Sequence, residues 1–276
     1  MTASLLTFYL LLFFVGASIG SFLNVCIARW PKEESVVRPR SRCPRCGASI
    51  GWFDNIPVLS WLALRAKCRS CGQAISPIYP LVEATTGIIW VAAAWTFASP
   101  VVAVRVAVFA TILFGVAVTD AKHYLIPDGF TLSGLLFGAA ASVAGGLLGS
   151  QGPFAEPMDA LFGACVGAGA ITIIGWLGEV ALKKEAMGFG DSTLMAMAGV
   201  ALGPGRALLT IFVAAFLAAV VFLVAVYPVV WVRSRRQGGE FRVPLVPFGV
   251  FLSPAALLTL LWGDTLIGWY LQRLVG

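Results

Sequence analysis

Residues 5–28 read LLTFYLLLFFVGASIGSFLNVCIA, a run without a single charged side chain. A helix that crosses a lipid bilayer needs about 20 apolar residues, so this run predicts a membrane span. A secretory signal peptide is the alternative, but such a peptide starts with basic residues. Here the chain starts with Met-Thr-Ala-Ser, and the first basic residue, Arg29, follows the run. We therefore expect the run to remain as the first membrane helix.

The remainder of the chain repeats this pattern. Apolar runs separated by charges, Gly or Pro lie at 79–99, 100–119, 126–149, 157–182, 191–204, 206–232 and 247–272. Of the 276 residues, 59% are hydrophobic and 12% are charged, whereas an ordinary soluble domain has about 25% charged residues. This composition excludes a soluble globule and a disordered chain. It predicts an all-α polytopic membrane protein with about eight transmembrane helices, of which 191–204 is short for a span.

Charge placement predicts the orientation of these helices. Nine of the 19 Lys and Arg residues fall within 29–78, the one long polar stretch. Cytoplasmic loops of membrane proteins are enriched in Lys and Arg, and 16 of the 19 lie inside if the N-terminus is outside and 29–78 is cytoplasmic. The inside residues beyond that stretch are Lys122, Lys183, Lys184, Arg233, Arg235, Arg236 and Arg242. Topology and contact with anionic membrane lipids explain the net charge of +6, so no nucleic-acid partner is expected.

Four cysteines of the polar stretch form two C-x2-C pairs, Cys43 with Cys46 and Cys68 with Cys71, each followed by a glycine. The 21 residues between the pairs are near the spacing of zinc sites. Two such turns complete a tetrahedral site of four sulfurs, where a metal is structural because no open position remains. Two disulfides are the alternative, which a reducing cytoplasm disfavours, and unliganded thiols are the third. We predict structural zinc, which a small domain with few large apolar residues needs in order to fold.

Two carboxylates are expected at the cytoplasmic edge of the membrane. Asp120 ends the third run, and Asp191 begins the sixth within the sequence GFGD. Two facing carboxylates in a low-dielectric site do not both ionise readily. The ionised one can take a proton from water while the protonated one polarises a carbonyl, which hydrolyses a peptide without a covalent intermediate. Gly188 and Gly190 lack a Cβ and so allow close approach and unusual φ/ψ. Ordinary interfacial charges or helix N-caps are the alternative for both aspartates.

Six sequence blocks, in order along nearly the whole chain, resemble those of the type IV prepilin peptidases, which are G-x-G-D intramembrane aspartyl proteases. The blocks are GSFLNV at 20–25, DNIPVLSW at 54–61, YPLVE at 79–83, IPD at 126–128, EAMGFGD at 185–191 and VPFG at 246–249. Asp120 comes six residues before the IPD block. The chain departs from the family pattern at Ile78, where Arg is usual, and at Thr193, where Lys is usual.

The resemblance implies an enzyme with two activities. It implies cleavage of the leader peptide from type IV prepilins or type II secretion pseudopilins, at the cytoplasmic face of the bacterial inner membrane. It further implies methylation of the new N-terminal amine with S-adenosylmethionine, and Asp120 and Asp191 as the catalytic pair. For Asp128 we favour an N-cap of the fourth span over a catalytic role. No glycine-rich nucleotide motif follows a predicted strand, so the methyl-donor site is unknown, and Asp264 in the last run has no assigned role.

We expect three parts in the chain. They are a first transmembrane helix at 1–28, a cytoplasmic tetracysteine zinc domain associated with methylation at 29–78, and a membrane aspartyl peptidase domain at 79–276. One alternative is a relative that only cleaves prepilins. The other is a transporter or scaffold with a zinc-stapled loop, although transporters place charged groups near the bilayer midplane and these aspartates are predicted at one edge.

Overall fold

A computed structural model describes residues 3–149, 152–183, 187–237 and 246–275. Within these ranges the regular structure is helical, with two isolated β-bridges besides, so the predicted all-α class is confirmed. The chain forms two compact units, residues 1–115 and 116–276, which we call the N-terminal and C-terminal units. The helix α4 (Pro100–His123) begins in the first unit and ends in the second. Four residues named in the predictions lie outside the described ranges: Lys184, Glu185, Ala186 and Arg242.

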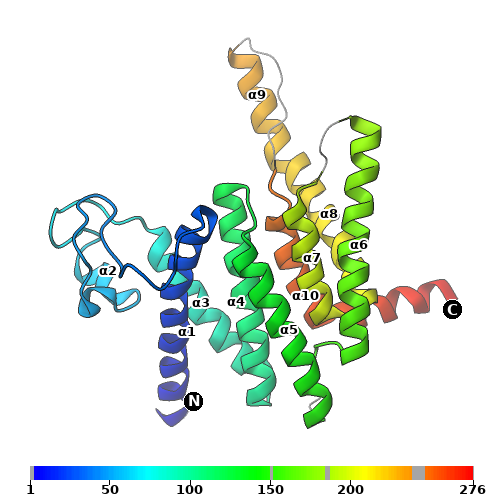
Figure 1. The fold of residues 1–276 in the computed structure, drawn as a ribbon, viewed down its shortest axis with the longest axis horizontal. Coiled ribbons are helices and arrows are strands. Elements are labelled where there is room, and N and C mark those ends of the chain that lie inside the picture. Colours follow the sequence, from blue (N-terminus) through cyan, green and yellow to red (C-terminus); the bar gives the residue numbers. More distant parts are fainter. Residues whose placement is uncertain (1–2, 150–151, 184–186, 238–245, 276) are drawn as a thin grey trace. The chain divides into compact units, whose positions relative to one another are not determined.

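In the N-terminal unit, α1 (Ala3–Arg29) packs along α3 (Ile78–Thr96) (Figure 1). A Cβ on Gly20 would lie only 2.8 Å from the Cα of Glu83. Small residues permit such close approach between membrane helices. Four residues further along α1, the Asn24 side chain donates a hydrogen bond to the Tyr79 carbonyl at 3.0 Å. The GSFLNV block therefore holds the end of the first helix against the YPLVE block.

The polar stretch between α1 and α3 forms a small domain with little regular structure. Its helical segments are η1 (Trp30–Lys32), η2 (Trp52–Asn55) and α2 (Leu59–Ala63). The β-bridges join Arg42 to Ser49 and Lys67 to Ala74, across the two C-x2-C pairs. Each pair therefore sits in a tight loop of its own, as the glycine after each pair predicts.

The C-terminal unit is a helix bundle. After the end of α4 it contains α5 (Asp128–Leu148), α6 (Pro157–Leu182), α7 (Phe189–Leu202), α8 (Pro204–Val221), the π-helical η3 (Phe222–Val226), α9 (Tyr227–Gln237) and α10 (Gly249–Val275). The backbones of α6 and α7 touch where Gly163 faces Gly199. Because neither position has room for a side chain, α7 can lie directly on α6.

The helix α7 lies among α5, α6, α8 and α10 (Figure 1). Its 14 residues make it about 21 Å long at 1.5 Å per residue, whereas the hydrocarbon core of a bilayer is about 30 Å thick. Met195, Met197 and Ala198 are fully buried. The sixth predicted run, 191–204, is thus a short helix within the bundle, covered by protein rather than by lipid.

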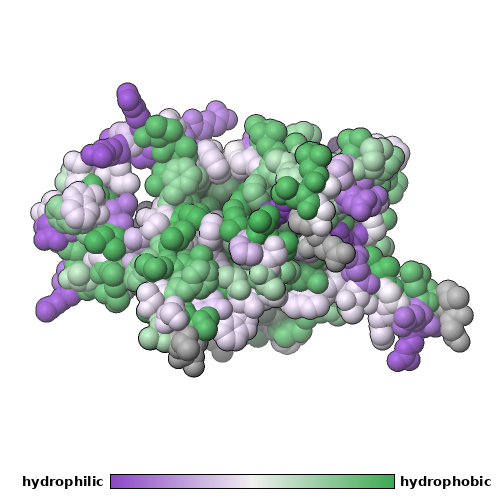
Figure 2. All heavy atoms as spheres, turned by 90° about the horizontal axis from the view of Figure 1, so that it is seen from below, coloured by the Kyte–Doolittle hydropathy of each residue, from purple (hydrophilic) through white to green (hydrophobic). Residues whose placement is uncertain are grey.

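Seven helices in the described ranges are long and apolar enough to cross a membrane. They are Ala3–Lys32, Ile78–Thr96, Pro100–His123, Asp128–Leu148, Pro157–Ala181, Pro204–Val232 and Gly249–Leu274. Large apolar side chains stand exposed on them, among them Leu147, Trp176 and Phe212, and hydrophobic surface covers much of the face seen in Figure 2. Monomeric soluble proteins rarely expose so much contiguous apolar surface, so lipid contact accounts for it.

Asp264, which had no assigned role, meets the half-buried Arg206. The Nη1 atom of Arg206 lies 3.5 Å from Asp264 Oδ2 and donates to the Pro153 carbonyl at 2.7 Å. The Nε atom of Arg206 donates to the Leu202 carbonyl, also at 2.7 Å. Arg206 therefore caps the end of α7 through the Leu202 carbonyl, and Asp264 on α10 forms a solvent-exposed ion pair with it.

Candidate active site, metal centre and cavity

Asp120 lies on the last turn of α4, in the C-terminal unit, and is 5% exposed. The helix continues four residues beyond the predicted run 100–119, to His123. The backbone amides of Gly249 and Val250, at the start of α10, face the Asp120 carboxyl group. The Asp120 Oδ2 atom is nevertheless buried without a hydrogen-bond partner among the described residues. Because an unsatisfied buried acceptor is costly, this atom is one that a substrate or a water would satisfy.

Asp191 lies on the first turn of α7, where its N–H donates to the Gly188 carbonyl at 3.1 Å. The carboxyl groups of Asp191 and Asp120 are close enough to repel one another electrostatically. The structure thus brings together the two aspartates that the sequence singles out. They lie on α4 and α7, and 65 residues separate the end of α4 from the start of α7. Neither is a helix N-cap, since Gly188 occupies that position in α7.

Ile126 lies against two glycines near this pair. A Cβ on Gly190 would lie 3.0 Å from Ile126 Cβ, and one on Gly249 would lie 2.9 Å from Ile126 Cδ1 and 2.8 Å from Asp120 Oδ2. Close approach therefore explains Gly190, as predicted. Gly188, by contrast, has an ordinary extended backbone with φ −76° and ψ 151°, so the expected unusual φ/ψ is not found there. Ile126 belongs to the IPD block and Gly249 to the VPFG block, but nothing in the sequence indicates that these two residues lie against each other.

The prediction that Asp128 caps the fourth span is wrong. Asp128 is the first helical residue of α5, the N-cap position is held by Pro127, and no side chain caps the helix. Pro127 has an extended ψ of 141°, so the chain enters the helix one residue earlier than a capping aspartate would require. At this position the Asp128 carboxylate still faces the positive end of the helix dipole.

The four cysteines of the polar stretch form one cluster. The sulfur atoms of Cys43, Cys46, Cys68 and Cys71 all lie within 4.8 Å of one another, and the Cys43 and Cys71 sulfurs are 4.0 Å apart. Tetrahedral coordination with metal–sulfur bonds of about 2.3 Å spaces its sulfurs by about 3.8 Å. All four thiols are unpaired, and the cluster can therefore bind a metal ion.

The two loops of the cluster have the same backbone construction. The N–H of Gly47 donates to the Cys43 carbonyl and that of Gly72 to the Cys68 carbonyl, both at 2.9 Å. The two glycines have φ of 73° and 69°, in the left-handed region that favours glycine. Backbone amides of Cys46 and then Arg45 point at the Cys43 sulfur and lower its pKa to about 6. At Cys43, the thiolate that binds a metal is thus favoured without an ion.

A cavity of about 730 Å³ lies in the N-terminal unit beside the cluster. Three of the six sequence blocks contribute to its wall, GSFLNV through Asn24, DNIPVLSW through Asp54 and YPLVE through Glu83. Ligand pockets of small molecules measure about 300–1,000 Å³. The sequence did not locate this cavity, because its walls come from segments that only the fold brings together.

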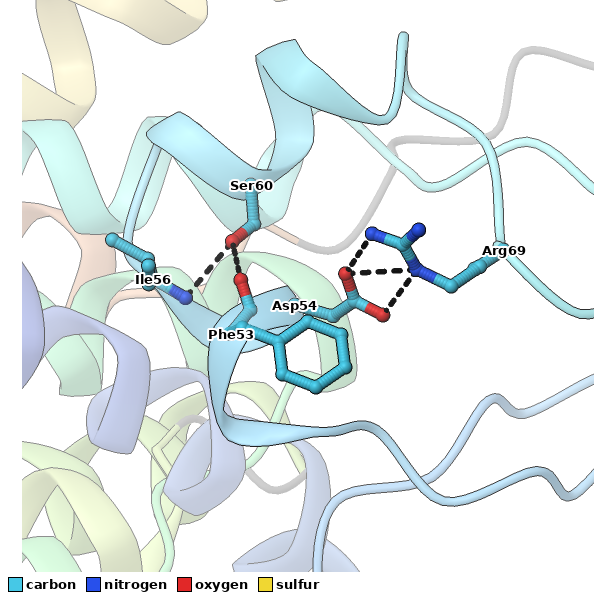
Figure 3. A network of polar contacts seen from close by, with 5 residues as sticks. All are labelled: Phe53, Asp54, Ile56, Ser60 and Arg69. Atoms are coloured by element: carbon cyan, nitrogen blue, oxygen red, sulfur yellow. Dashed lines mark hydrogen bonds and ion pairs between the residues drawn. The ribbon is translucent and has the colours of Figure 1, made fainter.

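An ion pair links the cavity wall to the second cysteine loop (Figure 3). Arg69, which stands between Cys68 and Cys71, binds the Asp54 carboxylate with two nitrogens, at 2.7 Å and 2.8 Å. Its guanidinium also lies 5.6 Å from the centre of the Phe53 ring. The hydrogen bonds to Arg69 lower the pKa of Asp54 below its ordinary value. The geometry of the cysteine loop and that of the DNIPVLSW block are therefore coupled.

The chain is thus a polytopic membrane protein with two neighbouring carboxyl groups, those of Asp120 and Asp191, and with a tetracysteine cluster beside a cavity. Comparison with known proteins identifies its family. Residues 14–97 match the family model described as the bacterial peptidase A24 N-terminal domain, and residues 107–223 match that of the type IV leader peptidase family. The chain belongs to the family of prepilin leader peptidase/N-methyltransferases. As a family member with these helices, it is a multi-pass protein of the inner membrane.

Several curated relatives carry the name prepilin leader peptidase/N-methyltransferase. The protein from Stutzerimonas stutzeri is 36% identical, over 97% of this chain and 95% of its own. That from Pseudomonas aeruginosa is 34% identical, over 97% of this chain and 94% of its own. A relative from Myxococcus xanthus is 43% identical over 70% of this chain, and the match spans about half of its length, 55%. No solved structure matches the chain significantly.

Proposed function

We propose that this protein cleaves the leader peptide from type IV prepilins or type II secretion pseudopilins and then N-methylates the new N-terminal residue. The observation that carries the first activity is the pair of neighbouring carboxyl groups of Asp120, which is buried, and Asp191, which is half-buried, with one Asp120 oxygen unsatisfied among the described residues. The names of the relatives, which cover both activities, support the second. A cleavage-only enzyme is the second candidate, favoured by the departures at Ile78 and Thr193.

The aspartate pair suits hydrolysis by an activated water. One carboxylate, ionised, takes a proton from water, and the other, protonated, donates a hydrogen bond to the scissile carbonyl oxygen. The hydroxide oxygen bonds to the carbonyl carbon, and collapse of the tetrahedral species breaks the C–N bond as a proton passes to the leaving nitrogen. Gly188 and Gly190 leave room at the start of α7, where Asp191 enters this site.

We further propose that zinc occupies the tetracysteine cluster in a structural role. All four sulfurs would coordinate it, leaving no open position for catalysis. We assign 29–78 to a methylation-associated domain, 1–28 to the first transmembrane helix and 79–276 to the peptidase domain. The excess of basic residues in 29–78 supports a cytoplasmic location for the cysteines and an outside N-terminus.

The residues around the cavity of the N-terminal unit fit a methyl donor. S-adenosylmethionine supplies an electrophilic methyl group on a positively charged sulfur and also carries a carboxylate. The cavity wall offers both signs of charge: three acidic residues, Glu34, Asp54 and Glu83, and five basic ones, Arg29, Lys32, Arg42, Arg45 and Arg69. The volume of about 730 Å³ lies in the range of small-molecule sites. This cavity is where this chain would hold the donor.

Mass spectrometry of a prepilin N-terminus tests both activities together. Purified enzyme and prepilin are incubated with and without S-adenosylmethionine. We expect loss of the leader in both samples and one added methyl group only with the donor. An uncleaved prepilin would contradict the proposed peptidase, and cleavage without methylation would leave the cleavage-only candidate.

A methyl group added at Gly249 should impair cleavage. In Gly249→Ala, the new Cβ would lie 2.8 Å from Asp120 Oδ2, so the carboxylate or α10 must shift. Because a displacement of about 1 Å can cost about 100-fold in rate, we expect a loss of that order in prepilin cleavage. Gly268→Ala on the same helix is the control, since its Cβ would meet nothing within 4 Å. Equal cleavage rates for the two variants would contradict the close packing at Gly249.

A further inference from the structure

Glu83 presents a carboxylate to the cavity of the N-terminal unit. Its Oε2 atom accepts a hydrogen bond from the Val58 N–H at 2.8 Å, and the Ser21 side chain also bonds to it. The donors come from α1 and from the DNIPVLSW block, whereas Glu83 itself lies on α3. Three separate segments therefore set the position of this one carboxylate.

The donor on the DNIPVLSW block has a strained backbone. Val58 has φ 62° and ψ −50°, and the Leu59 N–H donates to the Pro57 carbonyl at 2.6 Å. This is a γ-turn of the rare type, and a positive φ is exceptional for a β-branched residue. Strained backbone of this kind gathers at functional sites. Here the turn directs the Val58 N–H at Glu83, so the strain serves the placement of the carboxylate.

Glu83 also differs from the other acidic residues of the cavity in its charge balance. Asp54 is paired with Arg69, and Glu34 is exposed to solvent. Glu83 is half-buried. The ion pairs found in the described part of the chain are those of Asp54 and Asp264, and the hydrogen bonds to Glu83 come from neutral groups. A partly buried carboxylate without a cationic partner favours a positively charged ligand.

We propose that Glu83 binds the N-terminal ammonium of the cleaved pilin and accepts its proton during methyl transfer. This inference rests on the proposed methyltransferase activity. An α-amino group has a pKa of roughly 7.7–8.0 in peptides, so near neutral pH it is mostly protonated and has no free lone pair. A carboxylate at the site can both hold this cation and deprotonate it.

The proposed step balances without a further reactant. One ammonium proton passes to the Glu83 carboxylate, and the freed nitrogen lone pair attacks the methyl carbon of the donor. A C–N bond forms as the C–S bond breaks, and the bonding pair stays on sulfur, which becomes a neutral thioether. The product is a secondary ammonium, and Glu83 then returns its proton to water.

A binding experiment without the methyl donor tests the ammonium contact. The full-length, zinc-loaded protein is titrated with a short synthetic peptide that begins with phenylalanine, and with the same peptide acetylated at its N-terminus. We expect wild type to bind the free amine about tenfold more tightly, as a charged hydrogen bond would give. Glu83→Gln should bind both peptides alike, since it keeps an oxygen for the Val58 N–H but loses the charge. Glu33→Gln, at an exposed acidic residue outside the cavity wall, should keep the wild-type difference.

Methylation of a pre-cleaved pilin tests the proton transfer. Removing a general base costs about 100-fold or more, and we expect this loss in Glu83→Gln while binding of S-adenosylmethionine alone is unchanged. Unaltered amine discrimination, or a methylation rate like that of wild type, would overturn the role of Glu83. Weakened binding of S-adenosylmethionine with unaltered peptide binding would assign Glu83 to the donor and overturn it as well. If wild type itself adds no methyl group, the proposed methyltransferase activity fails instead.

Discussion

Asp120→Asn and Asp191→Asn are each expected to lower prepilin cleavage by at least about a thousandfold, because general acid–base catalysis needs both carboxyl groups. Asparagine is close in size to aspartate but can neither take a proton from water nor donate one as an acid. Asp120 is buried in the bundle, and asparagine fills the same space, so the protein should remain folded in the membrane. The measurement is the initial rate of leader removal from purified prepilin.

Asp128→Asn is the matched control for these variants. It makes the same chemical change on an exposed residue at the start of α5. There the carboxylate interacts favourably with the helix dipole and is not part of the aspartate pair. We expect cleavage close to the wild-type rate. If either Asp120→Asn or Asp191→Asn cleaves like this control, the two residues are not the catalytic pair.

The second large effect is expected from Cys43→Ser combined with Cys46→Ser. Removing two of four sulfurs should release zinc, and zinc binding contributes about 10–16 kcal/mol of folding free energy in small zinc domains. The stretch 29–78 should therefore unfold, and N-methylation should be lost. Zinc content measures the release of the metal, limited proteolysis measures the unfolding, and mass spectrometry of the pilin measures the methylation. Cys165→Ser, at an exposed cysteine outside the cluster, should retain metal and methylation. A wild-type protein that contains no zinc and four reactive thiols would contradict the metal assignment.

Acidification should release the same metal from the intact protein. The pKa of Cys43 is lowered to about 6 by the backbone amides that point at its sulfur, so its thiolate predominates above that pH. As the pH falls through about 6, protons compete with zinc for this sulfur, and the affinity for zinc falls. A chromogenic chelator would follow the release, and an affinity for zinc that does not change as the pH falls through about 6 would contradict this expectation.

The sequence predicted the parts of the fold that depend on local pattern. The long apolar runs became helices, and the paired C-x2-C motifs, each with a following glycine, formed one cluster of four cysteines. The two aspartates could be selected because few carboxylates lie beside membrane spans and each has a recognisable motif. In each of these cases the information lies within a few neighbouring residues.

The parts that could not be predicted depend on contacts between distant segments. Nothing in the VPFG block indicates that Gly249 faces Asp120, because this contact exists only once α10 packs near the end of α4. Likewise, the positive φ of Val58 is improbable for valine. The hydrogen bond from its N–H to Glu83, a residue distant in the sequence, accounts for this conformation. The sequence also could not predict that protein covers α7, because an apolar stretch of 14 residues has the same composition whether lipid or protein surrounds it.

The position of α10 bears on how the protein is made. A chain emerges from the ribosome from its N-terminus, so α10, which supplies Gly249 beside Asp120 and covers part of α7, is inserted after the other helices of the bundle. Until then the aspartate pair lacks one of its walls. Until α10 is in place, the backbone amides of Gly249 and Val250 therefore cannot face the Asp120 carboxyl group, and the surroundings of the aspartate pair are incomplete.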